Sequence, residues 1–570
     1  MSQLTTADEE RRCWVKCTSC SRLLYAPKHE RNLNVCSECG HHERLTAHER
    51  IAQLVDSGTF RPLAIEILPV DDLNFVDSRP YTDRLADAIS ATDLQEAVVV
   101  GTGRIDGTAV VLAVMDFRFL GGSLGAGTGE LIARAVDHAI ETSCPFVVVT
   151  ASGGARMQEG TLSLVQMASI SQVLSRLRAA GLLSVSVLTD PTFGGVAASF
   201  ATNVDVVIAE RGARMGFAGR RVIAQTVGVE LPADFQTAAF LLEHGHVDLV
   251  FERRDLRATL GRLVGFTRPA HRPVATPTVP STVIRRRSAI APVVETRAAA
   301  ETIALARDIR RPTFLDYLGM LVDDFVEFHG DRASADDPAL VAGIGRLRGR
   351  PAALLGQQRG HSTGELVARG FGMPTPAGYR KATRVIKLAS RIGLPIVCLI
   401  DTPGAHPGPQ SEKAGQAGAI AECIQTLGES RSPVVSVITG EGGSGGALAL
   451  GVADEVLMLE NAMYSVISPE GCATILWGTA DRAAHAAEAL RVGAEPQLAL
   501  GVVDGIVSEP DGGAHTNPHA TAEALADAIV RALDLRHGIP SDELIAARSN
   551  RFRRLSAARV RRDNQPWTPR

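Results

Sequence analysis

The sequence predicts an α/β protein in which one domain occurs twice, behind a small metal-binding module. Three observations support this: a duplicated strand–glycine–helix pattern, a proline-rich stretch between the two copies, and four cysteines in two close pairs near the N-terminus. At 570 residues the chain is too long for one hydrophobic core, because domains typically hold about 100–200 residues. We therefore expect several structural units joined by a linker.

The composition is that of an ordinary globular protein, and it excludes several functions. Hydrophobic residues make up 45% and charged residues 21%, and the net charge of −4 argues against a nucleic-acid surface as the main feature. No glycine-rich loop ends in Gly-Lys-Ser/Thr, so the P-loop type of ATP site is absent from the sequence. No apolar leader and no stretch near 18 uncharged apolar residues occur, so we expect a cytoplasmic protein without membrane contact.

The cysteine pattern C-x2-C-x15-C-x2-C predicts a zinc ribbon over residues 13–40. Four thiolates at about 2.3 Å would close a tetrahedron around a structural zinc ion and leave no open position for catalysis. We expect the 15-residue insert to fold as a short β-hairpin, and we do not count His41 or His42 as ligands because the site is already full. The four predicted ligands are Cys17, Cys20, Cys36 and Cys39.

The rest of the chain repeats itself. In each copy an apolar strand runs into a glycine loop, and a second apolar strand follows and ends in Gly-Gly before a helix. The interval from Gly153 to Gly194 is 41 residues, and the interval from Gly404 to Gly445 is the same. The pattern predicts largely parallel sheets in two related domains. We place the domains and flanking segments at residues 41–266, 267–300 (a Pro/Arg-rich linker), 301–550 and 551–570 (a basic tail).

The Gly-Gly pairs predict sites for negative charge. Without a β-carbon the backbone can adopt a positive φ and approach a ligand closely, and N–H groups at a helix N-terminus favour an anion. We call Gly194–Gly195 the first glycine pair and Gly445–Gly446 the second glycine pair. The segment around Ser444 also satisfies the G-x-S-x-G pattern of hydrolases. Aligned on the glycine pairs, however, Ser444 matches Phe193, which has no nucleophilic atom.

Two other site types are alternatives to this interpretation. A serine hydrolase that uses Ser444 with His485 or His515 stays open as an alternative. A dinucleotide site is disfavoured because the glycine order is not G-x-G-x-x-G with an acid downstream.

Long motifs give the sequence a family resemblance. They are WVKCTSCSRLLYAPKHERNLNVCSECGHH, FLGGSLG, ASGGARMQ, LTDPTFGGVAASFA and GFAG in the first half, and RPTFLDYL, GDRASADDPALVAGI, FGMPTPAGYRKA, IDTPGAHPG, GEGGSGGALALGV and YSVISPEGCATILW in the second. Over about residues 13–550 the chain closely resembles the bacterial multisubunit acetyl-CoA carboxylase carboxyltransferase, with its β and α subunits fused in that order.

The resemblance implies two crotonase-like domains in tandem and transfer of a carboxyl group from N-carboxybiotin to acetyl-CoA, giving malonyl-CoA. It implies that the N–H groups of the first glycine pair face the thioester carbonyl and those of the second face the ureido carbonyl of biotin. Decarboxylated biotin would accept the substrate proton, which would explain why no acid–base dyad is evident. We expect the neighbouring loops to bind substrate through Gly153, Gly154, Arg156 and Gly404, and we expect Arg156 and Glu470 to be structural or ligand-orienting.

The resemblance also implies partners. The sequence has no biotinyl-lysine motif, so biotin must arrive on a separate biotin carboxyl carrier protein that a separate biotin carboxylase charges. We expect at least a homodimer. The chain departs from the family pattern at His406, where tyrosine is usual, and at Arg220 and Ala224, where proline and glutamate are usual. These changes leave the choice of acyl chain open.

Three alternatives remain. The first is carboxylation of propionyl-CoA or another acyl-CoA. The second is a biotin-independent crotonase-type thioester enzyme. The third is a zinc-ribbon protein that binds nucleic acid through basic residues around the cysteines and through the arginine-rich tail.

Overall fold

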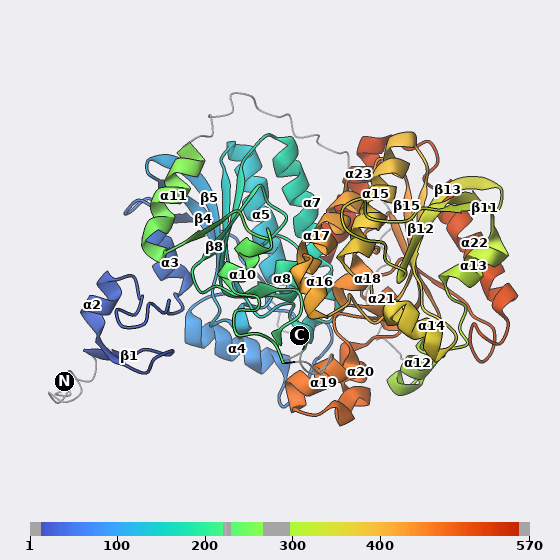
Figure 1. Cartoon of the computed structure of the whole chain (residues 1–570), viewed down its shortest axis with the longest axis horizontal. Coiled ribbons are helices and arrows are strands. Elements are labelled where there is room, and N and C mark those ends of the chain that lie inside the picture. The colour runs from blue at the N-terminus through green and yellow to red at the C-terminus, as the bar shows by residue number, and fades with distance from the viewer. Residues whose placement is uncertain (1–12, 221–222, 224–229, 266–296, 558–570) are drawn as a thin grey trace.

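A computed structural model describes residues 13–220, 223, 230–265 and 297–557 of the chain. Figure 1 shows the cysteine-containing module at one end of the long axis, followed by two α/β domains side by side. We call residues 41–265 the first domain and residues 297–557 the second domain. Most of the expected linker, the end of the expected tail and Ala224 lie outside the described residues. Among the helices of the described ranges, none is long and apolar enough to cross a membrane.

The N-terminal module differs from the expected hairpin. Strand β1 (Trp14–Lys16) pairs antiparallel with β2 (Leu23–Tyr25), so the partner of β2 precedes the first cysteine pair. The insert then continues as helix α2 (Ala26–Arg31), with Pro27 in its first turn. The prediction of a hairpin within the insert is therefore wrong. Proline has no N–H to donate to a strand ladder, but it is well tolerated at the start of a helix.

The first domain is built on a mixed sheet with strand order β10-β8-β7-β6-β5-β4-β3, in which β9 pairs with β7. Pairing is parallel from β10 to β5 and antiparallel through β4 and β3. The strands are β3 (Arg61–Pro62), β4 (Val98–Ile105), β5 (Thr108–Met115), β6 (Phe146–Ser152), β7 (Ser184–Phe193), β8 (Val206–Glu210), β9 (Met215–Gly216) and β10 (Leu249–Phe251). The central strands are buried on both faces, which explains their unbroken apolar runs.

Helices cover both faces of this sheet. Side chains of α3 and α11 form one apolar layer with strands β5 to β8, and α5 and α7 cover the opposite face. The helices are α3 (Ala47–Leu54), α4 (Tyr81–Thr92), α5 (Ala126–Thr142), α6 (Thr161–Leu164), α7 (Gln166–Ala179), α8 (Gly194–Ala197), α10 (Ala238–Glu243) and α11 (Arg253–Gly265).

The second domain repeats this topology. Its strand order is β11-β12-β13-β14-β15-β16-β18, with β17 paired to β15. The strands are β11 (Val322–Glu327), β12 (Leu340–Leu347), β13 (Arg350–Gln357), β14 (Ile396–Thr402), β15 (Val434–Gly443), β16 (Glu455–Leu459), β17 (Met463–Ser465) and β18 (Gly505–Val507). The repeat extends to the entry helices, because α3 and α13 both begin with a threonine capping box, at Thr46 and Thr313. The predicted α/β duplication is confirmed.

The helices of the second domain again cover both faces of the sheet. They are α12 (Ala299–Ala306), α13 (Phe314–Leu321), α14 (Thr363–Ala368), α15 (Pro376–Ile392), α16 (Pro409–Lys413), α17 (Gln416–Gly428), α18 (Ser444–Leu448), α19 (Pro469–Trp477), α20 (Ala483–Leu490), α21 (Ala494–Ala499), α22 (Pro518–Asp534) and α23 (Ser541–Ala557). Helix α12 begins inside the segment expected to be linker.

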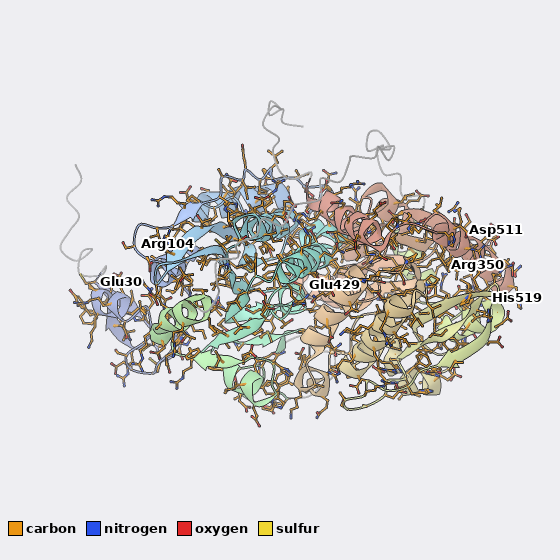
Figure 2. All side chains as sticks on the ribbon, turned by 90° about the horizontal axis from the view of Figure 1, so that it is seen from above. Glu30, Arg104, Arg350, Glu429, Asp511 and His519 are labelled. Carbon is orange, nitrogen blue, oxygen red and sulfur yellow. The ribbon has the colours of Figure 1, made fainter. Side chains whose placement is uncertain are left out.

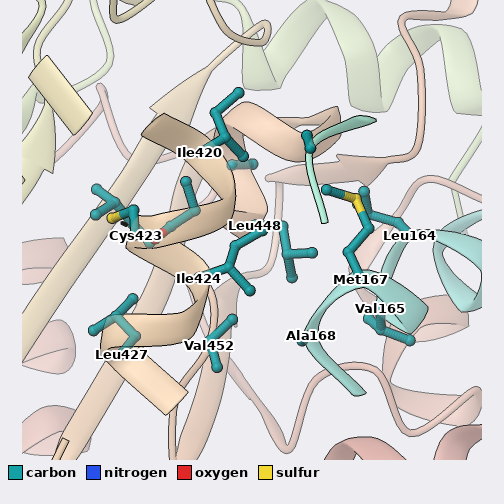
Figure 3. Close-up of a cluster of buried hydrophobic side chains, with 14 of the residues drawn as sticks. Leu164, Val165, Met167, Ala168, Ile420, Cys423, Ile424, Leu427, Leu448 and Val452 are labelled. Atoms are coloured by element: carbon teal, nitrogen blue, oxygen red, sulfur yellow. Dashed lines mark hydrogen bonds between the residues drawn. The ribbon is translucent and has the colours of Figure 1, made fainter. Parts of the chain in front are cut away.

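The two domains share one hydrophobic core. Figure 3 shows Leu164, Val165, Met167 and Ala168 of the first domain facing Ile420, Ile424, Leu427, Leu448 and Val452 of the second. In Figure 2, Glu429 at the end of α17 lies near the middle of the molecule, where the domains meet, and Glu30 and Asp511 lie toward opposite ends. The apolar side chains of both domains therefore belong to one continuous buried cluster.

Part of the expected basic tail belongs to this interface. Helix α23 extends to Ala557, past the expected boundary at residue 550. Arg553 forms ion pairs with Glu130 at 3.3 Å and Asp137 at 3.2 Å in α5 of the first domain. Arg551 pairs with Asp504. These two arginines are therefore structural and are not free to bind nucleic acid.

Candidate functional site

Each domain turns sharply where its central strand meets a short helix, and this junction contains a glycine pair. At the junction Gly194 has φ of +59° and Ser444 has φ of +53°. The preceding loops also match, since the N–H groups of Gly154 and Gly404 are bonded to the hydroxyls of Ser152 and Thr402. Both Gly154–Gly404 and Gly194–Ser444 are 250 residues apart, so the domains superpose in this register.

This register corrects the alignment made on the glycine pairs. Ser152 pairs with Thr192 in the first sheet and Thr402 pairs with Gly442 in the second, so Ser444 matches Gly194 and not Phe193. What the two domains share is a left-handed residue at the junction, and either glycine or serine can fill it. By strand pairing Gly195, the second residue of the first pair, matches Gly445, the first residue of the second pair. An alignment that matches the first glycine of each pair is therefore shifted by one residue.

The two glycine pairs lie close to each other across the domain interface. A β-carbon on Gly195 would be 3.3 Å from Sδ of Met167, and one on Gly445 would be 3.5 Å from Cε of the same methionine. Met167 belongs to α7 and is fully buried. One methionine side chain therefore separates the junctions, and the structure brings the two predicted sites together.

The second glycine pair is packed tightly against the preceding loop. A β-carbon on Gly446 would lie 2.4 Å from the backbone nitrogen of Ala405 and 2.6 Å from the carbonyl carbon of Gly404. The first four N–H groups of a helix have no acceptor within that helix. The glycine at position 446 thus allows an N–H-bearing turn and the Gly404 loop to approach each other closely.

Arg156 follows the first glycine loop, but its side chain cannot contact a substrate in this structure. It is 1% exposed, and its guanidinium donates to Glu96 at 2.7 and 2.9 Å and to Glu159 at 3.2 Å. Tyr81 donates to Glu159 in the same buried network. The assignment of Arg156 to substrate binding is therefore corrected: the residue supports the loop from behind.

Glu470 has a similar supporting role in the second domain. Arg307 donates to Glu470 at 2.7 Å and to Glu441 at 2.6 Å, and Glu441 lies in β15 just before the second glycine pair. This bridge joins α12 and α19 to the strand that ends at the site. The expectation that Glu470 is structural agrees with these contacts.

The hydrolase alternative receives no support from the geometry around Ser444. The left-handed conformation of Ser444 resembles that of a nucleophile elbow. No hydrogen bond joins its hydroxyl to a histidine within the part of the chain that the structure describes, and His515 instead contacts Arg310 and Asp308. The His485 ring lies 5.1 Å from the Trp477 ring, centroid to centroid, and is tilted by 58° against it.

Two of the departures from the family pattern, His406 and Arg220, lie within the described residues. His406 follows Ala405, and its Nδ1 accepts from the Gly408 N–H at 3.2 Å and contacts the Ser411 hydroxyl at 2.9 Å. A backbone N–H can only donate, so Nδ1 is an acceptor and neutral His406 has its proton on Nε2. Burial lowers the pKa of His406, which favours this neutral form. Arg220 donates to the carbonyls of Leu231, Pro232 and Phe235.

The four predicted metal ligands converge at the N-terminal module. The Sγ atoms all lie within 4.8 Å of one another, with Cys17–Cys39 at 3.7 Å and Cys20–Cys36 at 3.8 Å. A tetrahedron with metal–sulfur bonds of about 2.3 Å has edges of about 3.8 Å, so the four cysteines could hold one metal ion. His42 is directed elsewhere, toward Glu252 at 3.1 Å. Arg253 donates to the module carbonyls of Leu33 and Asn34 and to the Glu43 carbonyl of the first domain.

One residue at the site was missed by sequence reasoning. Glu412 of α16 in the second domain is buried and accepts hydrogen bonds from the N–H groups of Ala218 at 2.8 Å and Phe217 at 3.2 Å in the first. The Phe217 ring in turn lies 3.2 Å from a β-carbon built on Gly445. A single glutamate in the run EKAGQAG gives no signal of a partner nearly 200 residues away.

Comparisons with known proteins agree with this architecture. The family model described as acetyl co-enzyme A carboxylase carboxyltransferase-like matches residues 284–556. A protein of Salinispora tropica named acetyl-coenzyme A carboxylase carboxyl transferase subunits beta/alpha is 55% identical over 551 residues, which cover 96% of each chain. The alpha subunit of Thermus thermophilus is 51% identical over 257 residues, 45% of this chain and 81% of its own.

These relatives place the chain among the carboxyl transferases, and it is an enzyme of that class. It belongs to the family of acetyl-coenzyme A carboxylase carboxyl transferase subunits beta/alpha, whose members carry both subunit sequences on one polypeptide. The tandem crotonase-like fold implied by the resemblance agrees with the two duplicated sheets.

Proposed function

We propose that this chain transfers a carboxyl group from N-carboxybiotin, presented on a separate carrier protein, to acetyl-CoA and so forms malonyl-CoA. The observation that supports this most directly is the convergence of the two glycine pairs on either side of Met167. The reaction has two reactants that each develop a negative oxygen, so it needs two stabilising sites close together.

The first glycine pair is assigned to the acyl-CoA. Loss of a proton from the acetyl methyl group gives an enolate, and its charge moves to the thioester oxygen. The N–H groups of Gly194 and Gly195 would donate to that oxygen. Removing one such donor typically costs about 3–4 kcal/mol of transition-state stabilisation, so these contacts can supply much of the rate enhancement.

The second glycine pair is assigned to biotin. When the N–CO2 bond breaks, the electron pair returns to the ureido group, and the N–H groups of Gly445 and Gly446 would donate to the ureido oxygen. The ureido nitrogen then accepts the methyl proton, and the enolate carbon bonds to the carbon of CO2. Atoms and charge balance without a side-chain base. The backbones of Gly153, Gly154 and Gly404 would line the two reactants.

The four-cysteine site is assigned to one structural zinc ion. Its four thiolates match the geometry and the chemical preference of zinc, and a full thiolate set leaves no position for a substrate. The hydrogen bonds from Arg253 to the carbonyls of Leu33 and Asn34 would fix the zinc-bound module on the first domain. The active assembly would be at least a homodimer, working with a biotin carrier and a biotin carboxylase.

The test is a reconstituted assay with the full chain, a biotin carrier, biotin carboxylase, ATP and labelled bicarbonate. We expect labelled malonyl-CoA from acetyl-CoA and loss of the product when avidin is added. Product that persists with avidin would refute the biotin-dependent reaction in favour of a biotin-independent thioester enzyme. A higher kcat/KM with propionyl-CoA would instead reassign the acyl substrate.

A further inference from the structure

Helix α16 makes a contact between the domains that differs from the apolar interface in Figure 3. The carboxylate of Glu412 enters the first domain and accepts from two successive peptide N–H groups, those of Phe217 and Ala218. These groups belong to the GFAG loop (residues 216–219) after β9. Gly216 makes room for the Gln236 amide and for the carboxylate, because a β-carbon there would collide with Nε2 of Gln236 and lie 3.1 Å from a Glu412 oxygen.

The carboxylate of Glu412 is buried without a cationic partner among the described residues. Its other neighbour is the Gln236 amide, which donates to the Ala218 carbonyl of the same loop. Burying an unpaired carboxylate is costly, so its retention requires a structural or functional benefit. Burial raises the pKa of Glu412 to about 7, although the two N–H groups oppose the shift.

Charged and titratable groups surround Glu412 but bind the backbone of its helix and not the carboxylate. His246 of the first domain contacts the Lys413 carbonyl at 3.0 Å, and Arg380 of α15 donates to the Ala414 carbonyl at 3.0 Å. His244 and Glu422 line the same cavity of about 410 Å³ between the domains. His406 holds the start of α16 through Ser411. The helix is thus fixed from both domains, and its one inward acid is directed at the GFAG loop.

The GFAG loop of the first domain contacts the second glycine pair through the ring of Phe217. The Phe217 ring lies 3.2 Å from the β-carbon position of Gly445, on the side of the glycine that also faces Met167. If the loop moved, the wall against the second glycine pair would move with it. We propose that Glu412 is a positioning residue, which holds the GFAG loop and Phe217 against the second glycine pair and so fixes the distance between the two oxyanion sites. This inference rests on the proposed function.

The role requires the ionised carboxylate. The ionised carboxylate accepts one N–H group on each oxygen. Protonation turns one of these oxygens into a hydroxyl, which is a weaker acceptor and has a proton of its own to donate elsewhere. The two N–H groups lower the pKa of Glu412 against the effect of burial, so as long as the carboxylate stays buried its ionised form favours the loop contact and protonation weakens it. The loop is therefore held more firmly above about pH 7 than below it. A displacement of about 1 Å at a catalytic contact can cost 100-fold in rate, so partial loosening should cost about tenfold or more.

The experiment compares Glu412→Gln, Glu412→Ala and Glu412→Asp in the full chain, with Glu422→Gln as the matched control. Glu422 lines the same cavity but is exposed and paired with Lys387. Hydrogen exchange at Phe217 and Ala218 is followed from pH 5.5 to 8.5, together with malonyl-CoA formation. We expect faster exchange of these two amides in Glu412→Gln and Glu412→Ala, and a fall in kcat of about tenfold or more with the KM for acetyl-CoA unchanged.

The pH profile separates positioning from simple stability. Amide protection and kcat of the wild type should rise together through about pH 7, and both should become flat in Glu412→Gln. Glu412→Asp should recover part of both. Unchanged exchange at Phe217 and Ala218 in Glu412→Gln would overturn the proposal. If the wild type made no malonyl-CoA, the proposed function would fail, but the exchange data would still decide whether Glu412 holds the loop.

Discussion

Replacing Gly446 by alanine tests the second oxyanion site at the position where the structure allows least room. The new β-carbon would lie 2.4 Å from the Ala405 nitrogen, and ordinary contacts begin at 3.4 Å, so one backbone segment must move by about 1 Å. Both neighbours are backbone atoms and cannot rotate away. We expect a loss of stability of about 1–3 kcal/mol from overpacking and a fall in kcat of about 100-fold from the displaced N–H groups.

The assay is malonyl-CoA formation with carrier-bound biotin, together with thermal unfolding of the same samples. Gly418→Ala in α17 is the matched control, because no atom lies within 4 Å of its β-carbon position. That variant should keep full activity and gain up to about 1 kcal/mol from helix propensity. Full kcat in Gly446→Ala, at a temperature where the variant is folded, would refute the role of this N–H group.

Three further predictions concern the metal site, the buried arginine and the serine at the junction. Cys36→Ser should abolish the expected one zinc per chain in elemental analysis, whereas Cys13→Ser, outside the pattern, should keep it; retained zinc in the first variant would exclude the four-cysteine site. Arg156→Met removes the guanidinium that pairs with the buried Glu96 and Glu159 and should cost about 3–5 kcal/mol in the free energy of unfolding. Arg79→Met, which breaks the exposed pair with Asp87, should cost less than about 1 kcal/mol; equal costs measured by urea unfolding would contradict the buried network. At Ser444 a residue with a β-carbon adopts a left-handed conformation, which costs about 1–2 kcal/mol, and glycine adopts it without that cost. Ser444→Gly should therefore keep transferase activity with no loss of stability. An inactive but folded variant would favour a serine nucleophile.

The duplication was predictable because each copy contains the same short sequence patterns. Apolar strands, glycine loops and their spacing depend on residues close in sequence, and parallel sheets bury whole strands, so each strand leaves an unbroken apolar run. The cysteine spacing was equally informative, since two close pairs of thiols are enough to suggest a closed metal site. The fold of the 15-residue insert was predicted wrongly, because the strand that pairs with β2 lies before Cys17 and not within the insert.

The register between the domains needed the strand pairing. Glycine spacing alone matched Phe193 with Ser444, whereas the ladder matches Gly194 with Ser444. The difference arises because a left-handed turn accepts glycine or, at some cost, serine, so the conformation is shared although the residue is not. The structure also decides between the two roles expected for Arg156, substrate binding and structural support. The place of Arg156 in ASGGARMQ suggests a ligand contact, but burial against Glu96 and Glu159 decides the direction of its side chain.

The sequence by itself thus determined the two α/β copies, the cluster of four thiols that could hold a metal ion, the glycine pairs and, through its long motifs, the family. Only the tertiary structure decided that the glycine pairs meet around Met167 and that Glu412 of the second domain binds the GFAG loop of the first. The physical reason is the range of the interactions. Strand patterns and metal-ligand spacing are set within tens of residues, whereas the site forms where α7 packs on α17, and that contact depends on the shapes of two complete domains.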